Sequence, residues 1–385
     1  MFPAPQHRRG SLVLLAAASL SLAACGTSST PAASSSAPSS TSASASASSA
    51  NPAVAEASKA VEAAKTPDAS FQAPSVSAGP VPTGKKVAAV TALNAAPLPY
   101  QVATLFVDHA KAVGMSGDVL DGKGTPAGWD AAVRTALNGN AAAIGMSASE
   151  PSLIPEAAAD AAAKGVKFTT MYGCESPKPA GVTMEVPESR ASEGALLADW
   201  VIANSPEGAS VMMFTNSQFF CLKGEAEAFK AELAKGGPSF TVVEEQEATP
   251  ADQAGAAAVQ KVSAILRKHP DAKYFFVMQA DWAPILEQGL KATGRTDVTG
   301  LMADYDSNVL ELMRQEKNLV AAGQSWDQVA WIGLYAAIAG INGVDVPTFA
   351  PTVHLVDSTN MGTSGDPMAP GYDLDAAWKD YLTTG

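Results

Sequence analysis

Short apolar runs alternate with helical patterns along most of the chain beyond residue 84. The runs have the length of strands, and between them apolar residues recur every three or four positions, as at Val102, Leu105 and Phe106. This alternation is typical of βαβ units in a parallel sheet. The predicted strands are residues 86–91, 118–120, 141–146, 167–171, 182–186, 210–215, 240–244, 273–278, 298–302, 319–322 and 353–356.

So many strands would make an unusually large single sheet, so two smaller doubly wound parallel sheets are the better prediction. The fold class is therefore α/β with two lobes. Ligands of open parallel sheets bind at the carboxyl ends of the strands. We expect the functional residues in the loops that lead from strands into helices.

The first 25 residues have a different pattern. Arg8 and Arg9 precede an apolar run over residues 11–20, and small residues lead to Cys25. This order is that of a signal peptide, and the run is too short to be a membrane-spanning helix. It resembles the lipobox of bacterial lipoproteins, so we predict a signal peptide over residues 1–24 and lipidation of Cys25. The alternative is an ordinary secretory signal in which Cys25 is incidental.

Residues 25–83 are predicted to form a disordered tether and an arm. The stretch 27–50 is almost entirely Ser, Ala, Thr and Pro, with too little apolar bulk to fold. Asn51 and Pro52 then provide a helix start, so we predict a short lone helix over residues 51–65. The Pro-, Ser- and Gly-rich residues 66–83 indicate an extended arm.

Charge narrows the possible partners. Without Arg8 and Arg9, the 25 basic residues of the chain become 23, against 38 acidic residues, which gives a net charge of −15. Such an acidic chain is not expected to bind nucleic acid. Basic patches that would grip anionic lipid are also missing from the sequence, so membrane contact is expected through the lipid anchor alone.

Few residues suggest catalysis or metal binding. The histidines of the mature chain, His109, His269 and His354, are far apart in the sequence and lack metal-ligand spacing. A Gly-x-Ser-x-Gly elbow does not occur in the sequence. We therefore predict no catalytic residue, no metal and no cofactor. Cys174 and Cys221 are an even pair in a compartment that permits disulfides, and a bond between them and two free thiols both stay open.

Several phrases occur in the same order as in a known family. The chain from Gly84 onward resembles the type I periplasmic solute-binding proteins, particularly the ribose- and galactose-type sugar-binding components of ABC importers. The phrases are Lys85–Thr91 as the first strand, Ala163–Thr170 as a later strand, Glu188–Ala195 at the start of the second domain, His269–Val277, and Val320–Gln328.

The resemblance implies two lobes that close on a ligand, joined by three crossings near Pro187, Gln324 and His354. Lobe one would comprise residues 84–186 plus 325–353, and lobe two residues 187–324 plus 354–385. A membrane permease would recognise the closed form.

The resemblance also indicates binding residues in lobe one. The loop after the first strand would supply Asn94 as a hydrogen-bonding group and Tyr100 as a packing group, although Tyr100 could equally cover a helix end. After the fourth strand the family usually has Asp-Arg, whereas this chain has Tyr172-Gly173. That departure puts a ribose-like ligand in doubt, and Tyr172 could still line the cleft.

In lobe two the candidates follow successive strands. Phe219 or Phe220 would stack on a ligand, and Lys223 falls where the family often has Arg. Gln279 stands at a family Asn position, and Trp282 is either a stacking platform or a cap on its own helix. The remaining candidates are Asp304 and the hinge residue Gln324.

These observations together predict an extracytoplasmic lipoprotein at the cell membrane that binds a small polar solute, a sugar or related compound, for an ABC importer. The alternative is a lipoprotein of the same fold that senses a ligand or binds a partner protein without feeding a transporter. An exported enzyme is disfavoured.

Overall fold

The computed structural model describes residues 51–173, 178–187, 189–217, 220–248, 252 and 256–384. All eleven predicted strands are present in it, arranged in two sheets with helices, so the predicted fold class is confirmed. The strands are β1 Lys86–Thr91, β2 Ser116–Asp121, β3 Ala141–Ser147, β4 Lys167–Gly173, β5 Val182–Pro187, β6 Ala209–Thr215, β7 Phe240–Glu247, β8 Tyr274–Val277, β9 Thr299–Ala303, β10 Leu319–Gln324 and β11 Val353–Val356.

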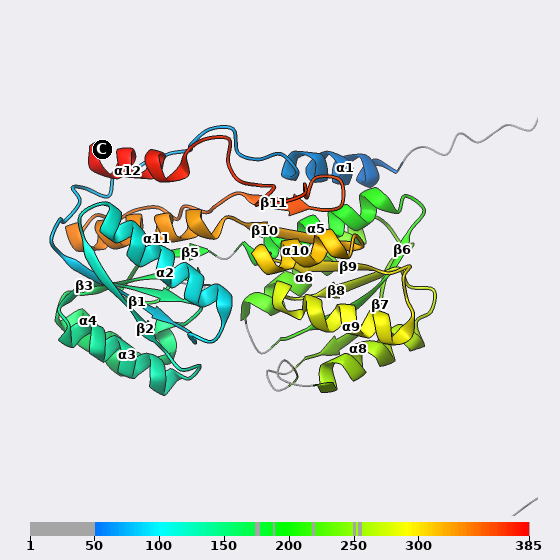
Figure 1. Ribbon diagram of the computed structural model, residues 1–385, viewed down its shortest axis with the longest axis horizontal. Helices are drawn as coiled ribbons and strands as arrows, with labels where there is room; N and C mark the ends of the chain where they lie inside the picture. Colours follow the sequence, from blue (N-terminus) through cyan, green and yellow to red (C-terminus); the bar gives the residue numbers. More distant parts are fainter. Residues whose placement is uncertain are drawn as a thin grey trace, which may run out of the picture. The chain divides into compact units, whose positions relative to one another are not determined.

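Helices connect the strands (Figure 1). They are α1 Pro52–Ala64, α2 Pro97–Ala112, α3 Pro126–Asn138, α4 Pro155–Ala163, α5 Arg190–Asn204, α6 Phe220–Lys235, α8 Ala256–Lys268, α9 Ala283–Thr293, α10 Ser307–Gln315, α11 Trp326–Asn342 and α12 Leu374–Thr384, with the short 3-10 helices η1 Pro151–Leu153 and η2 Ala280–Trp282. None of the described helices is both long and apolar enough to cross a membrane.

Each sheet has its own core. Lobe one is built on the sheet of order β2-β1-β3-β4-β5, and lobe two on the sheet of order β11-β10-β9-β8-β6-β7. The described strand pairs are parallel except that β11 runs antiparallel to β10. Because both faces of a parallel sheet are covered by helices, its strands read as nearly continuous apolar runs, and β10 is buried along its whole length. The alignment of parallel strands brings their carboxyl ends to one edge of each sheet.

The predicted helix over residues 51–65 is confirmed as α1. The Asn51 side chain accepts a hydrogen bond from the backbone N–H of Ala53 at 3.1 Å and so caps the helix. Ala57 and Val61 are buried in the core of lobe two. The Lys65 ammonium also forms an ion pair with Asp357 at 2.7 Å. α1 is therefore a packed part of the domain and not a lone helix in the arm.

The C-terminal helix differs from the expected lobe assignment. Residues 354–385 were expected in lobe two, but α12 packs on lobe one, where Trp378 is fully buried. The Trp378 ring lies within 6.5 Å, centroid to centroid, of five aromatic rings, which belong to Phe71, Trp331, Tyr335, Phe349 and Tyr381. An amphipathic helix must bury its apolar face, and this aromatic cluster is on lobe one.

Two segments therefore connect the lobes in addition to the three crossings that were expected. One is the arm between α1 and β1, and the other leads from β11 to α12. They run side by side where the backbone N–H of Gly371 donates to the carbonyl of Asp68 (Figure 1). Tyr335 and Tyr381 donate from their hydroxyls to the carbonyl of Val76 at 2.7 and 2.9 Å. We call residues 65–85 the strap.

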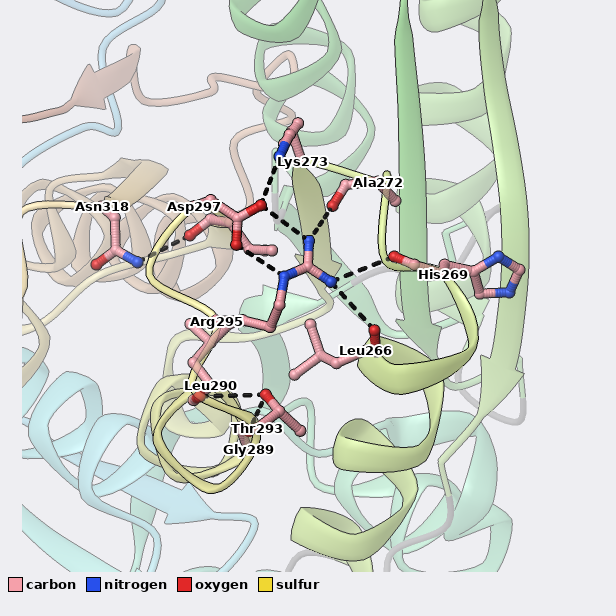
Figure 2. Close-up of polar contacts among 11 residues, drawn as sticks. Leu266, His269, Ala272, Lys273, Gly289, Leu290, Thr293, Arg295, Asp297 and Asn318 are labelled. Atoms are coloured by element: carbon pink, nitrogen blue, oxygen red, sulfur yellow. Dashed lines mark hydrogen bonds and ion pairs between the residues drawn. The ribbon is translucent and has the colours of Figure 1, made fainter.

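A guanidinium clamp holds the connection between α8 and β8 in lobe two (Figure 2). Arg295 donates to the carbonyls of Leu266, His269 and Ala272 and to the carboxylate of Asp297. Leu266 belongs to the last turn of α8, where carbonyls lack partners within the helix. Arg295 and then Lys273 hold the pKa of Asp297 well below its usual range. The clamp lies at the amino ends of the strands, so it stabilises the sheet away from the ligand-binding edge.

Replacing Trp378 tests whether α12 belongs to the folded domain. A buried Trp→Ala change costs about 3–5 kcal/mol of unfolding free energy through lost burial and a cavity, so Trp378→Ala should lower stability by that amount in urea unfolding. The control is Leu153→Ala, since half of the Leu153 surface is exposed and its loss should cost less than about 0.5 kcal/mol. Equal effects of both changes would show that α12 does not stabilise lobe one.

Candidate functional site

A cavity of about 220 Å³ lies between loops of the two lobes, at the carboxyl ends of five strands. Lobe one contributes the start of α2 after β1, Ala148 after β3 and Tyr172 at the end of β4. Lobe two contributes residues 279–281 after β8 and 304–306 after β9. This is the edge at which open parallel sheets bind ligands. Its volume is slightly below the range of about 300–1,000 Å³ for drug-sized ligands and so suits a small molecule.

The two walls of the cavity differ in polarity. The wall from lobe one is largely apolar, made by Ala96, Ala148 and the segment Pro97-Leu98-Pro99. The wall from lobe two carries the Gln279 amide and three carboxylates, those of Asp281, Asp304 and Asp306. An occupant would therefore meet hydrogen-bonding groups mainly on one side.

Tyr172 connects the two lobes at this cavity. Its hydroxyl donates to Asp304 Oδ2 at 2.8 Å and accepts a hydrogen bond from the Arg190 guanidinium at 2.5 Å. The ring packs edge-on against Trp326, with the centroids 4.8 Å apart. Tyr172 and Asp304 both have left-handed backbone conformations, with φ of 67° and 63°. Such strain in non-glycine residues is concentrated at functional sites.

Arg190 lies in the first turn of α5 and is almost fully buried. It forms ion pairs with Asp304 and, at 3.3 Å, with Glu225 of α6, and it donates to the carbonyl of Met278 at 2.8 Å. α5 and α6 can approach closely because residue 194 is glycine. A Cβ at this position would lie 2.4 Å from the Glu225 carbonyl oxygen, which is too close. The glycine thereby brings the guanidinium and Glu225 together.

The acidic groups of the cavity have shifted pKa values. Burial raises the pKa of Asp304, and the Arg190 guanidinium and the Tyr172 hydrogen bond oppose the rise. Asp281 has part of its surface exposed, yet the surrounding protein removes hydration from the carboxyl and raises its pKa to about 6. Arg190 opposes this rise and Asp304 adds to it. The Asp281 carboxyl therefore titrates close to neutral pH.

Three of the predicted site residues line the cavity, namely Tyr172, Gln279 and Asp304. Gln324 is nearby at the end of β10, since the backbone N–H of Asp304 donates to the carbonyl of Ala322 at 2.7 Å. The Gln324 amide is buried, and neither its oxygen nor its nitrogen has a hydrogen-bond partner among the described residues. It is a polar group that a ligand could satisfy.

Other predicted residues lie elsewhere. Asn94 is exposed, and its side chain accepts a hydrogen bond from the Thr91 hydroxyl. Tyr100 is also exposed. Neither residue is part of the described cavity lining. Lys223 is exposed and pairs with Glu227 on its own helix. Trp282 is buried against Phe214, which fits the helix-cap alternative rather than a stacking platform.

Three predictions concern residues that the structure describes incompletely or not at all. Phe219 lies outside the described residues, and of Phe220 only the backbone is described, as the start of α6. Cys221 is disulfide-bonded. Cys25 and Cys174 lie outside the described residues, so the pairing of Cys174 with Cys221, like the lipidation of Cys25, stays a prediction.

Sequence reasoning missed Arg190 and Asp281. Arg190 shares a helix face with Leu197 and Val201, which are both buried, and a charged residue on an apolar face is a signal of a buried ion pair. Asp281 follows Gln279 directly after β8, so the end-of-strand rule could have identified it.

Comparisons with known proteins agree with this architecture. The sequence profile described as "Periplasmic binding protein domain" matches residues 100–344. No protein with a curated description is similar enough in sequence to count as a match.

Several solved structures have a similar fold. An ABC transporter solute-binding protein from Mycobacterium smegmatis with bound glycerol is 21% identical, with a TM-score of 0.64 over 73% of this chain and 98% of that one. The Caulobacter myo-inositol-binding protein bound to myo-inositol is 20% identical, with a TM-score of 0.63 over 76% and 97%. A 5-methylthioribose transporter solute-binding protein from Thermotoga lettingae, in complex with 5-methylthioribose, is 16% identical, with a TM-score of 0.67 over 81% and 99%.

The profile covers more than half of the chain, and the similar structures have the same two-lobed fold. The chain therefore belongs to the periplasmic binding protein family and has its type I fold.

Proposed function

We propose that this protein captures a small polar solute, a sugar or related polyol, in the cavity between its lobes and delivers it to an ABC permease. The observation that carries the proposal is that the walls of one cavity come from the strand ends of both lobes. A ligand there contacts both lobes only when they are close together, so binding shifts the equilibrium toward the closed arrangement.

The similar structures support the ligand class. They hold glycerol, myo-inositol and 5-methylthioribose, which are small and rich in hydroxyl groups. The cavity offers acceptors for such hydroxyls on its lobe-two wall, at Gln279, Asp281 and Asp306. Family membership supports transport in place of catalysis.

We also propose that Cys25 carries a lipid anchor on the extracytoplasmic face of the membrane. The sequence of residues 1–25 supports this, and α1 fixes the chain to lobe two directly after the tether. The folded domain would then be held within reach of a membrane permease.

A ligand screen tests the capture of a solute. Sugars, polyols, nucleosides and amino acids are added to the mature chain, and the unfolding temperature is measured. A ligand at 100 times its Kd should stabilise the protein by about 2.7 kcal/mol, and we expect a polyol or sugar to do so. If no solute shifts the transition, the receptor proposal is wrong.

Gln324→Ala should reduce the ligand-induced shift while the unfolding temperature of the free protein changes little. The reason is that the amide has no partner among the described residues to lose. The matched control is Gln315→Ala, on the exposed face of α10, which should leave the ligand-induced shift unchanged. If Gln324→Ala destabilises the free protein and keeps the full shift, its role is structural.

Tyr172→Phe should open the ligand-free protein, because it removes the hydroxyl that bonds to Asp304 and Arg190 of the other lobe. Hydrogen bonds to charged groups contribute about 1.5–3 kcal/mol each, so the radius of gyration in small-angle scattering should rise. Tyr274→Phe removes a hydroxyl that bonds to Ser205 within lobe two and should leave the radius unchanged. An unchanged radius in Tyr172→Phe would mean that this contact does not hold the lobes together.

Cys25→Ser should move the protein from the membrane fraction to the soluble fraction, because a serine cannot carry the thioether-linked lipid. Ser28→Ala, three residues further on, should stay in the membrane fraction. Retention of Cys25→Ser on the membrane would require a different anchor.

A further inference from the structure

The buried charged groups beside the cavity are paired with one another. Arg190, Glu225 and Asp304 each have no more than 2% of their surface exposed, and the Arg190 guanidinium forms ion pairs with both carboxylates. Buried charges are normally paired, because the loss of hydration costs several kcal/mol per ion.

The lobe-two wall of the cavity carries further carboxylates. Asp304 lines the cavity, and its Oδ1 is buried without a hydrogen-bond partner among the described residues. Asp281 and Asp306 line the same wall. Asp306 Oδ1 accepts from the backbone N–H of Val309 at 2.8 Å and so caps α10. Among the described residues that line the cavity there is no cationic side chain, and those from lobe one are Ala, Pro, Leu and Tyr172.

Arg190 compensates for only part of the charge of this wall, chiefly that of Asp304. Its guanidinium is held by Asp304, Glu225, the Tyr172 hydroxyl and the Met278 carbonyl. An anionic ligand would therefore meet the carboxylates of Asp281 and Asp306 as well as that of Asp304, which is paired with Arg190. Like charges brought together in a binding site are costly. A cation would form charge-assisted hydrogen bonds with the same oxygens.

We infer that the preferred ligand of this cavity carries a protonated amine, as an amino sugar or amino polyol does. This inference rests on the proposed function, since it assumes that the cavity is the ligand site. The amine would lie against Asp281 and Asp304. Gln279 provides a donor and an acceptor for hydroxyl groups, and the Pro97-Leu98-Pro99 wall packs against the carbon skeleton.

Matched ligands separate charge from shape. Glucitol, 1-amino-1-deoxyglucitol and gluconate share one open-chain skeleton with neutral, cationic and anionic ends, and glucose, glucosamine and glucuronate share a ring. Calorimetric titration of the full mature chain should show the amine of a set binding at least about tenfold more tightly than the neutral compound, a difference of about 1.4 kcal/mol. The anion should bind most weakly.

The outcomes distinguish the inference from the proposed function. If the neutral or the anionic compound binds as tightly as the amine, the inference is wrong and solute capture stands. If no compound of either set binds, solute capture of this kind fails, and the inference fails with it.

Asp281→Asn removes the charge and keeps the size of the side chain. The amine should lose at least about tenfold in affinity and the neutral compound less than about threefold, since an amide still bonds to hydroxyls. The control is Asp271→Asn, an exposed residue before the amino end of β8, which should change neither affinity. An equal loss for both ligands in Asp281→Asn would overturn the role of the charge.

The pH dependence of the unmutated protein gives a second measurement. Loss of hydration raises the pKa of Asp281 to about 6, and of the charged groups that act on it Arg190 opposes the rise while Asp304 and Asp306 add to it. Below that pH the carboxyl is protonated and neutral. Amine affinity should therefore fall as the pH decreases through 6, while glucitol affinity should change little. A parallel decrease for both ligands would contradict the inference.

Discussion

The buried guanidinium of Arg190 is the contact on which the ligand-binding edge depends. It connects the first turn of α5, the neighbouring helix α6 through Glu225, and the lobe-one residue Tyr172. It also pairs with Asp304, whose left-handed backbone shapes the loop after β9. A buried carboxylate without a cation is strongly destabilising. The Arg190 side chain therefore holds both Asp304 in the cavity wall and the contact that Tyr172 makes between the lobes.

The strands and the location of the site were predictable because they depend on local pattern and a general topological rule. Apolar runs marked the strands, and the residues directly after them, including Gln279 and Asp304, line the cavity. Trp282 shows the limit of that rule. It follows the same strand as Gln279, but the 3-10 turn at residues 280–282 directs its ring into the core against Phe214. Position in a loop does not determine side-chain direction.

Contacts between distant parts of the sequence were not predictable. The apolar face of α12 shows that the helix needs a partner, but the partner is an aromatic cluster that includes Phe71, some three hundred residues earlier. The role of Arg190 likewise depends on Glu225 and Tyr172, which are 35 and 18 residues away from it in the sequence. The family resemblance did not help here, since this chain has Tyr172 where sugar-binding members usually have Asp-Arg. The substitution replaces a pair of charged groups with a hydroxyl that bonds to charges already present in lobe two.

The docking of α1 has a mechanical consequence. The chain enters the domain at Asn51, whose side chain also donates to the carbonyl of Gly236, and α1 is then held on lobe two by buried apolar contacts and by the Lys65–Asp357 ion pair. Only after these attachments does the strap continue to lobe one. A force applied to the preceding chain is thus borne first by lobe two. Tension in the tether is therefore not transmitted directly to the segments that connect the lobes, so it does not oppose their opening and closing.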